Sequence, residues 1–170
     1  ADLVREDWGE VEVAVCPPFT GLKAVSTLIE LDKLKIALGA QDMHWEAEGA
    51  FTGAIAPRML ADLLCTYVIV GHSERREYFG ETNETVNRKV RAAFAAGLVP
   101  IMCVGESLAT REAMETESFV RKQVMEGAAG LDAAEAAKLV VAYEPIWAIG
   151  TGRTPTPEAA NDVCRTIRAT

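Results

Sequence analysis

The fold is decided by one stretch of the chain, Leu139-Val140-Val141-Ala142-Tyr143-Glu144-Pro145-Ile146-Trp147-Ala148-Ile149-Gly150-Thr151-Gly152. Its first five residues are apolar, as in a buried strand, and a proline stops the ladder. Glu144 ends this predicted strand, where a buried carboxylate is costly unless it has a function. The following loop carries large apolar side chains and two glycines, which is typical of a segment that closes over a ligand. We predict a base and a lid; the alternative is a solvated glutamate beside an ordinary apolar loop.

Outward from this stretch, apolar runs alternate with segments of helical spacing. The predicted strands are 11–16, 35–40, 67–70, 99–104 and 139–143, and the predicted helices are 18–31, 57–65, 83–96 and 107–138, the last with a break near 127–130. This alternation suits βα units with right-handed crossovers and a parallel sheet. It leaves a doubly wound sheet and a (β/α)8 barrel both open. No shift in composition suggests a second domain, so residues 1–170 are predicted to form a single domain.

Composition excludes several classes of function. The 170 residues are 49% hydrophobic and carry a net charge of -8, which argues against a nucleic-acid partner, and no apolar run is long enough to cross a membrane. The cysteines show no paired spacing, so we expect reduced core thiols at Cys16, Cys65, Cys103 and Cys164. With two histidines and no zinc-binding motif, we predict no metal.

Both ends of the chain lead us to expect a piece of a longer protein. Residues 1–5 begin without Met and already have the apolar spacing of a helix, with no signal peptide. Near the other end, Thr156-Pro157-Glu158 is a helix start with a cap and a proline at the first helical position, and only about a dozen residues follow.

A second group of polar residues, Gly71-His72-Ser73-Glu74-Arg75-Arg76, directly follows the strand 67–70. If a helix starts at Ser73, the helix dipole disfavours imidazolium at His72, and a neutral ring can donate a hydrogen bond to a carbonyl oxygen. The alternative is a histidine that only caps the helix. A strand-end base, a neutral polarising group and an apolar lid together suit proton abstraction next to a carbonyl, because an enediolate must be stabilised and shielded from water.

At these residues the chain resembles the triosephosphate isomerase family. The runs 69–76 and 142–152 are similar to that family's signatures. Similar segments follow one another in the same order: Cys16-Pro17-Pro18-Phe19-Thr20, Gly39-Ala40-Gln41-Asp42, Gly49-Ala50-Phe51-Thr52-Gly53 and Cys103-Val104-Gly105-Glu106. The resemblance covers essentially the whole chain. It implies a (β/α)8 TIM barrel, here incomplete, with about five parallel strands that correspond to the family's second to sixth.

The resemblance also implies an activity, the interconversion of dihydroxyacetone phosphate and glyceraldehyde 3-phosphate in glycolysis and gluconeogenesis, without a cofactor and in the cytoplasm. Glu144 matches the family's catalytic base, and His72 matches its catalytic, carbonyl-polarising histidine. Gly150 matches the lid glycine whose N–H binds the substrate phosphate, and Glu74 matches a supporting carboxylate. This pairing of a glutamate, a neutral histidine and a closing loop is a known property of the family and is no discovery from this chain.

The segment 43–55 is too apolar for a passive loop, since it carries Met43, Trp45, Phe51 and Ile55. It is similar to the family's loop that inserts into a partner subunit, so we expect a homodimer through 43–55. The alternative is a loop folded back on its own core.

The chain departs from the family in what it lacks. The family's first strand supplies an asparagine and a catalytic lysine, and the loops after its seventh and eighth strands supply most phosphate-binding amides; none has a counterpart here. We therefore expect the segment alone to be poorly active or inactive. The alternative is a non-catalytic barrel segment that acts by self-association or complementation. Pro155 stands at the family's second lid hinge, where it is expected to stiffen the lid.

Two alternative functions, a Schiff-base aldolase and a dinucleotide-binding protein, each require residues that the sequence lacks. A Schiff-base aldolase on a similar barrel needs a lysine at the carboxyl end of a strand, and no predicted strand has one. A dinucleotide-binding loop would need a third glycine after Gly150 and Gly152, where Pro155 intrudes instead.

Overall fold

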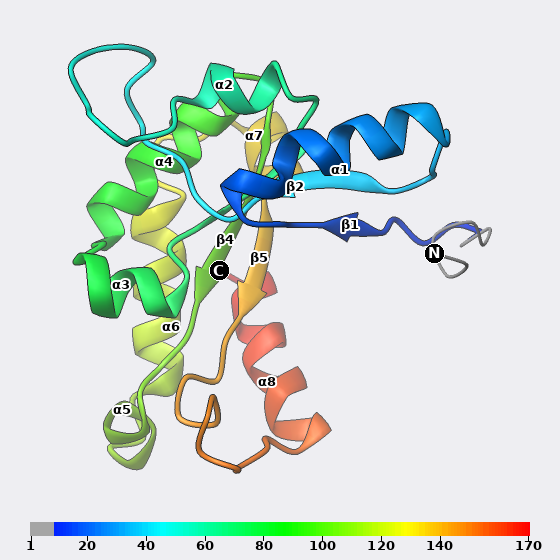
Figure 1. Ribbon diagram of the computed structural model, residues 1–170. Coiled ribbons are helices and arrows are strands. Elements are labelled where there is room, and N and C mark those ends of the chain that lie inside the picture. The colour runs from blue at the N-terminus through cyan, green and yellow to red at the C-terminus, as the bar shows by residue number, and fades with distance from the viewer. Residues whose placement is uncertain (1–8) are drawn as a thin grey trace. The chain divides into compact units, whose positions relative to one another are not determined.

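The computed structural model describes residues 9–170, so the helix predicted from residues 1–5 lies outside the described residues. The chain divides into two compact units. The described part of unit 1 comprises residues 9–70 and 91–100, and unit 2 comprises residues 71–90 and 101–170. Figure 1 labels the helices and strands of both units.

Unit 1 contains three parallel strands, β1 (Ala14–Val15), β2 (Ala37–Ala40) and β3 (Tyr67–Val70). The helices α1 (Phe19–Leu31) and α2 (Pro57–Ala61) connect them, and α1 lies against β2 (Figure 1). The next strand begins in this unit, because the Val99 N–H donates to the Thr66 carbonyl over 2.8 Å. The buried core of unit 1 includes Leu22, Leu38, Ala40, Leu60 and Val68.

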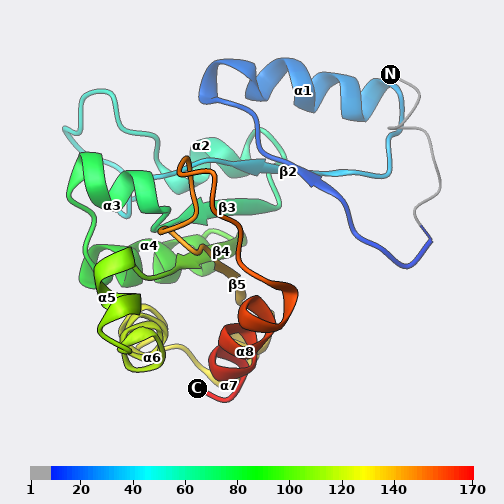
Figure 2. The same ribbon diagram turned by 90° about the horizontal axis from the view of Figure 1, so that it is seen from below.

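Unit 2 contains the carboxyl-terminal part of β4 (Val99–Val104) and the strand β5 (Val140–Tyr143), which pair in parallel from Ile101 opposite Val140 to Val104 opposite Tyr143. Its helices are α3 (Ser73–Phe79), the first part of α4 (Asn83–Ala95), α5 (Leu108–Glu112), α6 (Thr116–Gly127), α7 (Ala133–Lys138) and α8 (Pro157–Arg168). Helices α6 and α8 lie side by side, and α8 also contacts β5 (Figure 2).

The strands are hydrogen-bonded in the order in which they follow one another along the chain, β1-β2-β3-β4-β5. The prediction of an incomplete (β/α)8 TIM barrel with about five parallel strands is therefore confirmed. Strands β3 and β4 have the predicted bounds, whereas β1 is reduced to two residues, with Val11 66% exposed. A single domain over residues 1–170 stays a prediction.

The helical segment 107–138 differs most from its prediction. The break near 127–130 is present between α6 and α7, but a further break separates α5 from α6. Met114, between these two helices, adopts a left-handed φ of 61°. A methionine side chain gives no reason to predict a positive φ. The start of α8 is as predicted: the Ala159 N–H donates to Thr156 Oγ1 over 3.2 Å, and Pro157 is the first helical residue.

The segment 43–55 is an irregular loop between β2 and α2 (Figure 1). Met43 is buried, and the His44 N–H closes the base of the loop on the Ile55 carbonyl over 2.8 Å. The His44 ring centroid lies 4.4 Å from the ring centroids of both Trp45 and Phe51. Residues 46–53 are exposed, so the loop packs only in part on itself. No helix within residues 9–170 is long and apolar enough to cross a membrane.

Candidate active site

Glu144 is held at the carboxyl end of β5 by a close approach of two backbones. Its N–H donates to the Val104 carbonyl over 2.8 Å, which extends the pairing of β4 and β5 by one residue. A Cβ at Gly105 would lie only 1.8 Å from the Glu144 carbonyl oxygen. The buried Gly105 N–H donates to Gln123 Oε1 over 2.9 Å. Only glycine leaves room for the backbone that carries the predicted base.

The Glu144 carboxylate is surrounded by donors from the loop after β3. Ser73 donates twice, from its N–H to Oε2 over 3.0 Å and from Oγ to Oε1 over 3.1 Å. The His72 Nε2 atom lies 2.8 Å from Oε1. The structure thus brings together the two residues predicted to be catalytic, which are far apart in the sequence, and adds Ser73, for which no role was predicted.

The hydrogen bonds of His72 fix which ring nitrogen carries the proton. His72 is the N-cap of α3, which begins at Ser73 as anticipated, and its Nδ1 accepts the Glu74 N–H over 3.3 Å. A nitrogen that accepts carries no proton, so the proton of the neutral ring is assigned to Nε2, which faces Glu144. The Glu74 side chain is 70% exposed, and its Oε2 lies 3.7 Å from Nδ1, beyond hydrogen-bond distance. Glu74 therefore contacts the histidine through its backbone.

A buried charge cluster supports the turn before His72. Gly71 has a φ of 70°, and its N–H donates to Glu81 Oε2 over 3.2 Å. Arg75 Nε lies 2.6 Å and Lys89 Nζ 2.5 Å from Glu81 Oε1. Burial alone would raise the pKa of Glu81, but the hydrogen bonds and charges of Lys89 and Arg75 outweigh burial and lower it. The carboxylate therefore stays ionised and keeps the turn in place. Arg76 holds the other side of the turn, donating to the Gly71 carbonyl over 2.8 Å.

Cys103 places a protonated thiol next to Glu144, the predicted base. Burial raises the pKa of this cysteine to about 12, and the charge of Glu144 and a hydrogen bond to its carboxylate act in the same direction. The thiol is therefore a donor to Glu144 at neutral pH and no nucleophile. Burial also raises the pKa of Cys16 and, to about 11, that of Cys65.

The predicted lid is the irregular segment 145–155 between β5 and α8 (Figure 1). Gly150 and Gly152 have φ values of 70° and 75°, in the left-handed region that favours glycine. Gly150 is exposed, and no acceptor within residues 9–170 receives its N–H. The N–H at the predicted phosphate-binding position is thus available to a ligand.

A second carboxylate, Glu106, accepts hydrogen bonds from the predicted lid and from the strand before it. Glu106 is fully buried and accepts from Tyr143 Oη at 3.1 Å and from Trp147 Nε1 at 3.0 Å. Arg111 Nη1 pairs with the same carboxylate over 3.1 Å. Burial and the charge of Glu106 raise the pKa of Tyr143 to about 12, which keeps the phenol protonated as a donor. In the sequence, Glu106 ends the family-like segment 103–106 and follows a predicted strand, but no role was predicted for it.

The lysines lie on helices or in the segments beside them; Lys35, predicted to begin a strand, lies before the first residue of β2. They are Lys23 in α1, Lys33 and Lys35 between α1 and β2, Lys89 in α4, Lys122 in α6 and Lys138 in α7. No strand of the described chain has a lysine at its carboxyl end, and no three side chains of His, Cys, Asp or Glu are arranged there to hold a metal ion.

Parallel strands in chain order, with a glutamate and a histidine at their carboxyl ends, define the (β/α)8-barrel class. The family model described as "Triosephosphate isomerase" matches residues 2–170. The chain belongs to the triosephosphate isomerase family.

Three curated relatives named "Triosephosphate isomerase" illustrate the similarity. The chain is 55% identical to that of Dictyoglomus thermophilum over 165 residues, covering 97% of this chain and 66% of the relative. It is 55% identical to that of Carboxydothermus hydrogenoformans over 174 residues, covering 99% and 68%. It is 56% identical to that of Geobacter metallireducens over 151 residues, covering 89% and 59%. The chain thus spans about two thirds of the length of the first two relatives.

Proposed function

We propose that the protein carrying these residues is a triosephosphate isomerase that interconverts dihydroxyacetone phosphate and glyceraldehyde 3-phosphate. The observation that carries the proposal is the 2.8 Å contact between Glu144 Oε1 and His72 Nε2 at the carboxyl ends of two strands, next to a loop with an available Gly150 N–H. An aldose–ketose isomerisation needs a base for a carbon-bound proton and an acid for the oxygens, and this pair supplies both without a cofactor.

In the proposed reaction, Glu144 exchanges its contacts with Ser73 for the substrate. Its carboxylate takes the proton from the carbon next to the carbonyl, and the electron pair of that C–H bond forms the enediolate double bond. His72 donates Nε2–H to the oxygen where charge develops and relays the hydroxyl proton between the two oxygens. Glu144 then returns its proton to the neighbouring carbon, so the reaction is balanced without any oxidant.

The remaining residues have binding and supporting roles in this proposal. The Gly150 N–H binds the substrate phosphate when the lid closes, and closure excludes water from the enediolate. Glu74 supports His72 by fixing its tautomer through the backbone contact at 3.3 Å. The exposed loop 43–55 forms a homodimer contact. We further propose a cytoplasmic role in glycolysis and gluconeogenesis, with no nucleic-acid or membrane partner.

The 170-residue chain by itself is proposed to be poorly active or inactive. The transition state carries the negative charge of an enediolate and a phosphate, and the site contains no strand-end lysine to balance it. A second candidate function follows from the same observation: the segment acts without catalysis, by self-association or by complementation with the rest of a barrel.

The replacement Glu144→Gln in the full-length protein tests the proposed role of the base. Glutamine keeps the size and one oxygen acceptor but cannot take a proton, so we expect kcat to fall by about 10³-fold or more while KM changes little. Exchange of the substrate's carbon-bound hydrogen with deuterated water should be lost in parallel. Retained exchange would refute Glu144 as the base.

A further inference from the structure

Arg76 links the turn that carries His72 to the carboxyl-terminal end of β4. It lies in α3, and its Nε–H donates to the carbonyl of Gly71, the residue before His72, over 2.8 Å. From the same guanidinium, Nη2 donates to the carbonyl of Cys103 over 3.3 Å. One rigid, planar group therefore spans two backbone segments beside the candidate active site.

The Cys103 side of this link leads directly to Glu144. Cys103 is paired in parallel with Ala142 of β5. The next residue of β4, Val104, accepts the Glu144 N–H over 2.8 Å. The Cys103 thiol also forms a hydrogen bond with the Glu144 carboxylate. The end of β4 that accepts from Arg76 is therefore the same backbone that holds the predicted base.

A third attachment fixes the orientation of the guanidinium. Nη1 donates to Oδ1 of Asn83, the first residue of α4, over 2.7 Å. The Asn83 side-chain amide in turn donates to Glu126 Oε2 on α6 over 2.7 Å. Each of the three guanidinium nitrogens of Arg76 thus has an acceptor in a different segment of unit 2, which leaves the side chain little freedom to turn.

The charge of Arg76 strengthens this link. Burial lowers the pKa of the guanidinium, and the charges of Glu81 and Glu144, among others, act in the opposite direction. Because an arginine side chain is not deprotonated in proteins, all three hydrogen bonds are charge-assisted and stronger than bonds between neutral groups.

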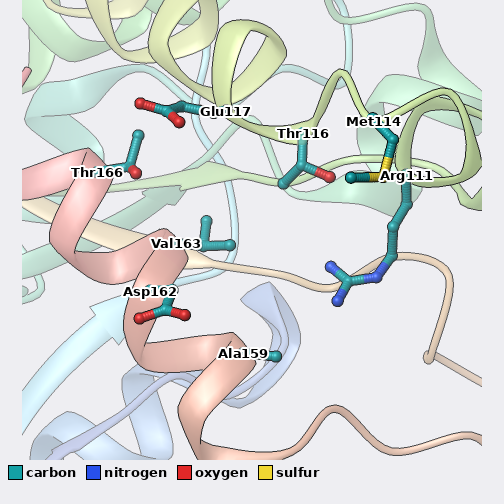
Figure 3. Close-up of a pocket in the computed structure, with 8 residues that line it drawn as sticks. All are labelled: Arg111, Met114, Thr116, Glu117, Ala159, Asp162, Val163 and Thr166. Atoms are coloured by element: carbon teal, nitrogen blue, oxygen red, sulfur yellow. The ribbon is translucent and has the colours of Figure 1, made fainter.

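A cavity in unit 2 lies apart from Arg76. This cavity, of about 450 Å³, lies between α5, α6 and α8 and is lined by Arg111, Thr116, Asp162 and Val163, among others (Figure 3). Arg76 is not among its lining residues. The hydrogen bonds of Arg76 with protein groups therefore indicate a role in the geometry of the site and not in binding a ligand in that cavity.

We propose that Arg76 is a positioning residue that sets the distance between His72 and Glu144. It does so by holding the Gly71 and Cys103 carbonyls on one guanidinium. No hydrogen bond joins Arg76 to either predicted catalytic side chain within residues 9–170, so its effect passes through the backbone. The inference rests on the proposed function, because a displacement of about 1 Å between groups that act on one substrate costs up to about 100-fold in rate.

Two substitutions in the full-length protein separate the link from the charge. Arg76→Met removes the charge and all three hydrogen bonds, and we expect kcat to fall by about 10- to 100-fold while KM changes by less than about twofold. Arg76→Lys keeps the charge, but an ammonium group lacks the fixed fork that reaches both carbonyls, so we expect a fall of about tenfold. The matched control is Arg165→Met, with unchanged kinetics, because the Arg165 side chain is 72% exposed and pairs over 3.1 Å with Asp162 of its own helix.

The NMR signal of the His72 ring gives a readout that does not need turnover. In ligand-free protein labelled with ¹⁵N-histidine, the Nε2–H proton resonates downfield because it faces a carboxylate oxygen 2.8 Å from Nε2. If Arg76 sets this spacing, the resonance should move upfield in Arg76→Met and keep its wild-type position in Arg165→Met. Urea unfolding of each variant ensures that rates are compared at equal folded concentration.

The outcomes separate this inference from the proposed function. An unchanged His72 resonance in folded Arg76→Met overturns the positioning role whatever the activity, and so does an unchanged kcat in an active protein. If Arg76→Met does not fold, a wild-type His72 resonance in Arg76→Lys overturns it equally. Absent isomerase turnover in the wild-type protein, with a shifted resonance in the Arg76 variants, would instead reject the proposed function and keep the positioning role.

Discussion

The position of the Glu144 backbone depends on the absence of a side chain at Gly105. Because a Cβ at Gly105 would lie 1.8 Å from the Glu144 carbonyl oxygen, Gly105→Ala must displace one of the two strand ends. We expect kcat/KM to fall by about 100-fold and the free energy of unfolding by about 1–3 kcal/mol. Steady-state kinetics and denaturant unfolding check both effects.

The control for Gly105→Ala is Gly21→Ala in α1. A Cβ there would have its nearest neighbour, Pro17 Cβ, at an ordinary 3.6 Å, so we expect unchanged kinetics and a gain in stability of up to about 1 kcal/mol. Wild-type turnover in Gly105→Ala would show that the strand ends can separate without moving the base.

The buried carboxylate of Glu81 makes the free energy of unfolding depend on pH. Its pKa is lowered in the folded state from the ordinary value of 4.5, so its contribution is present above pH 4.5 and is lost as the pH falls through the folded value. In Glu81→Gln this loss on acidification should be weaker. At neutral pH the variant should be less stable by about 2–4 kcal/mol, because Lys89 and Arg75 lose their carboxylate.

Urea unfolding between pH 3 and pH 7, roughly the window in which ordinary carboxyl groups titrate, measures this dependence. Glu84→Gln is the matched control, since Glu84 forms an exposed ion pair with Arg88 on the same helix and should cost less than about 1 kcal/mol. Parallel curves for wild type and Glu81→Gln would rule out the assigned role.

The sequence predicts the position of a side chain best where that residue lies at the end of a strand. His72 and Glu144 both end or follow apolar runs, and parallel strands bring such ends to one edge, so their proximity could be predicted. Ser73, Cys103 and Glu106 could not be assigned, because their contacts depend on side-chain directions. The break between α5 and α6 at Met114 could not be predicted either. A positive φ in a methionine is imposed by tertiary context and not by its own side chain.

The predicted lid connects β5 to α8, and Pro155 lies near its second end. Pro155 fixes its own φ and restricts Thr154, so Pro155→Ala gives the hinge more conformations. We expect the exchange of backbone amide hydrogens in residues 145–155 to become about two- to fivefold faster. Pro57→Ala, at the first position of α2 in unit 1, serves as the control and should leave the exchange unchanged. Equal rates in the two variants would place the hinge elsewhere.

The chain contains the predicted base Glu144, His72 and the predicted lid, but no strand within residues 9–170 has a lysine at its carboxyl end. Each preorganised charge or donor missing from a transition-state site costs about 10²–10³-fold in rate. We therefore expect the purified chain to turn over triose phosphate at least about 10³-fold more slowly than a full-length relative, in a coupled assay at equal folded concentration. Light scattering on the same sample measures whether it self-associates. Turnover near that of the full-length relative would contradict the expectation, whereas an inactive chain that gains activity on mixing with the complementary part of a barrel would support complementation.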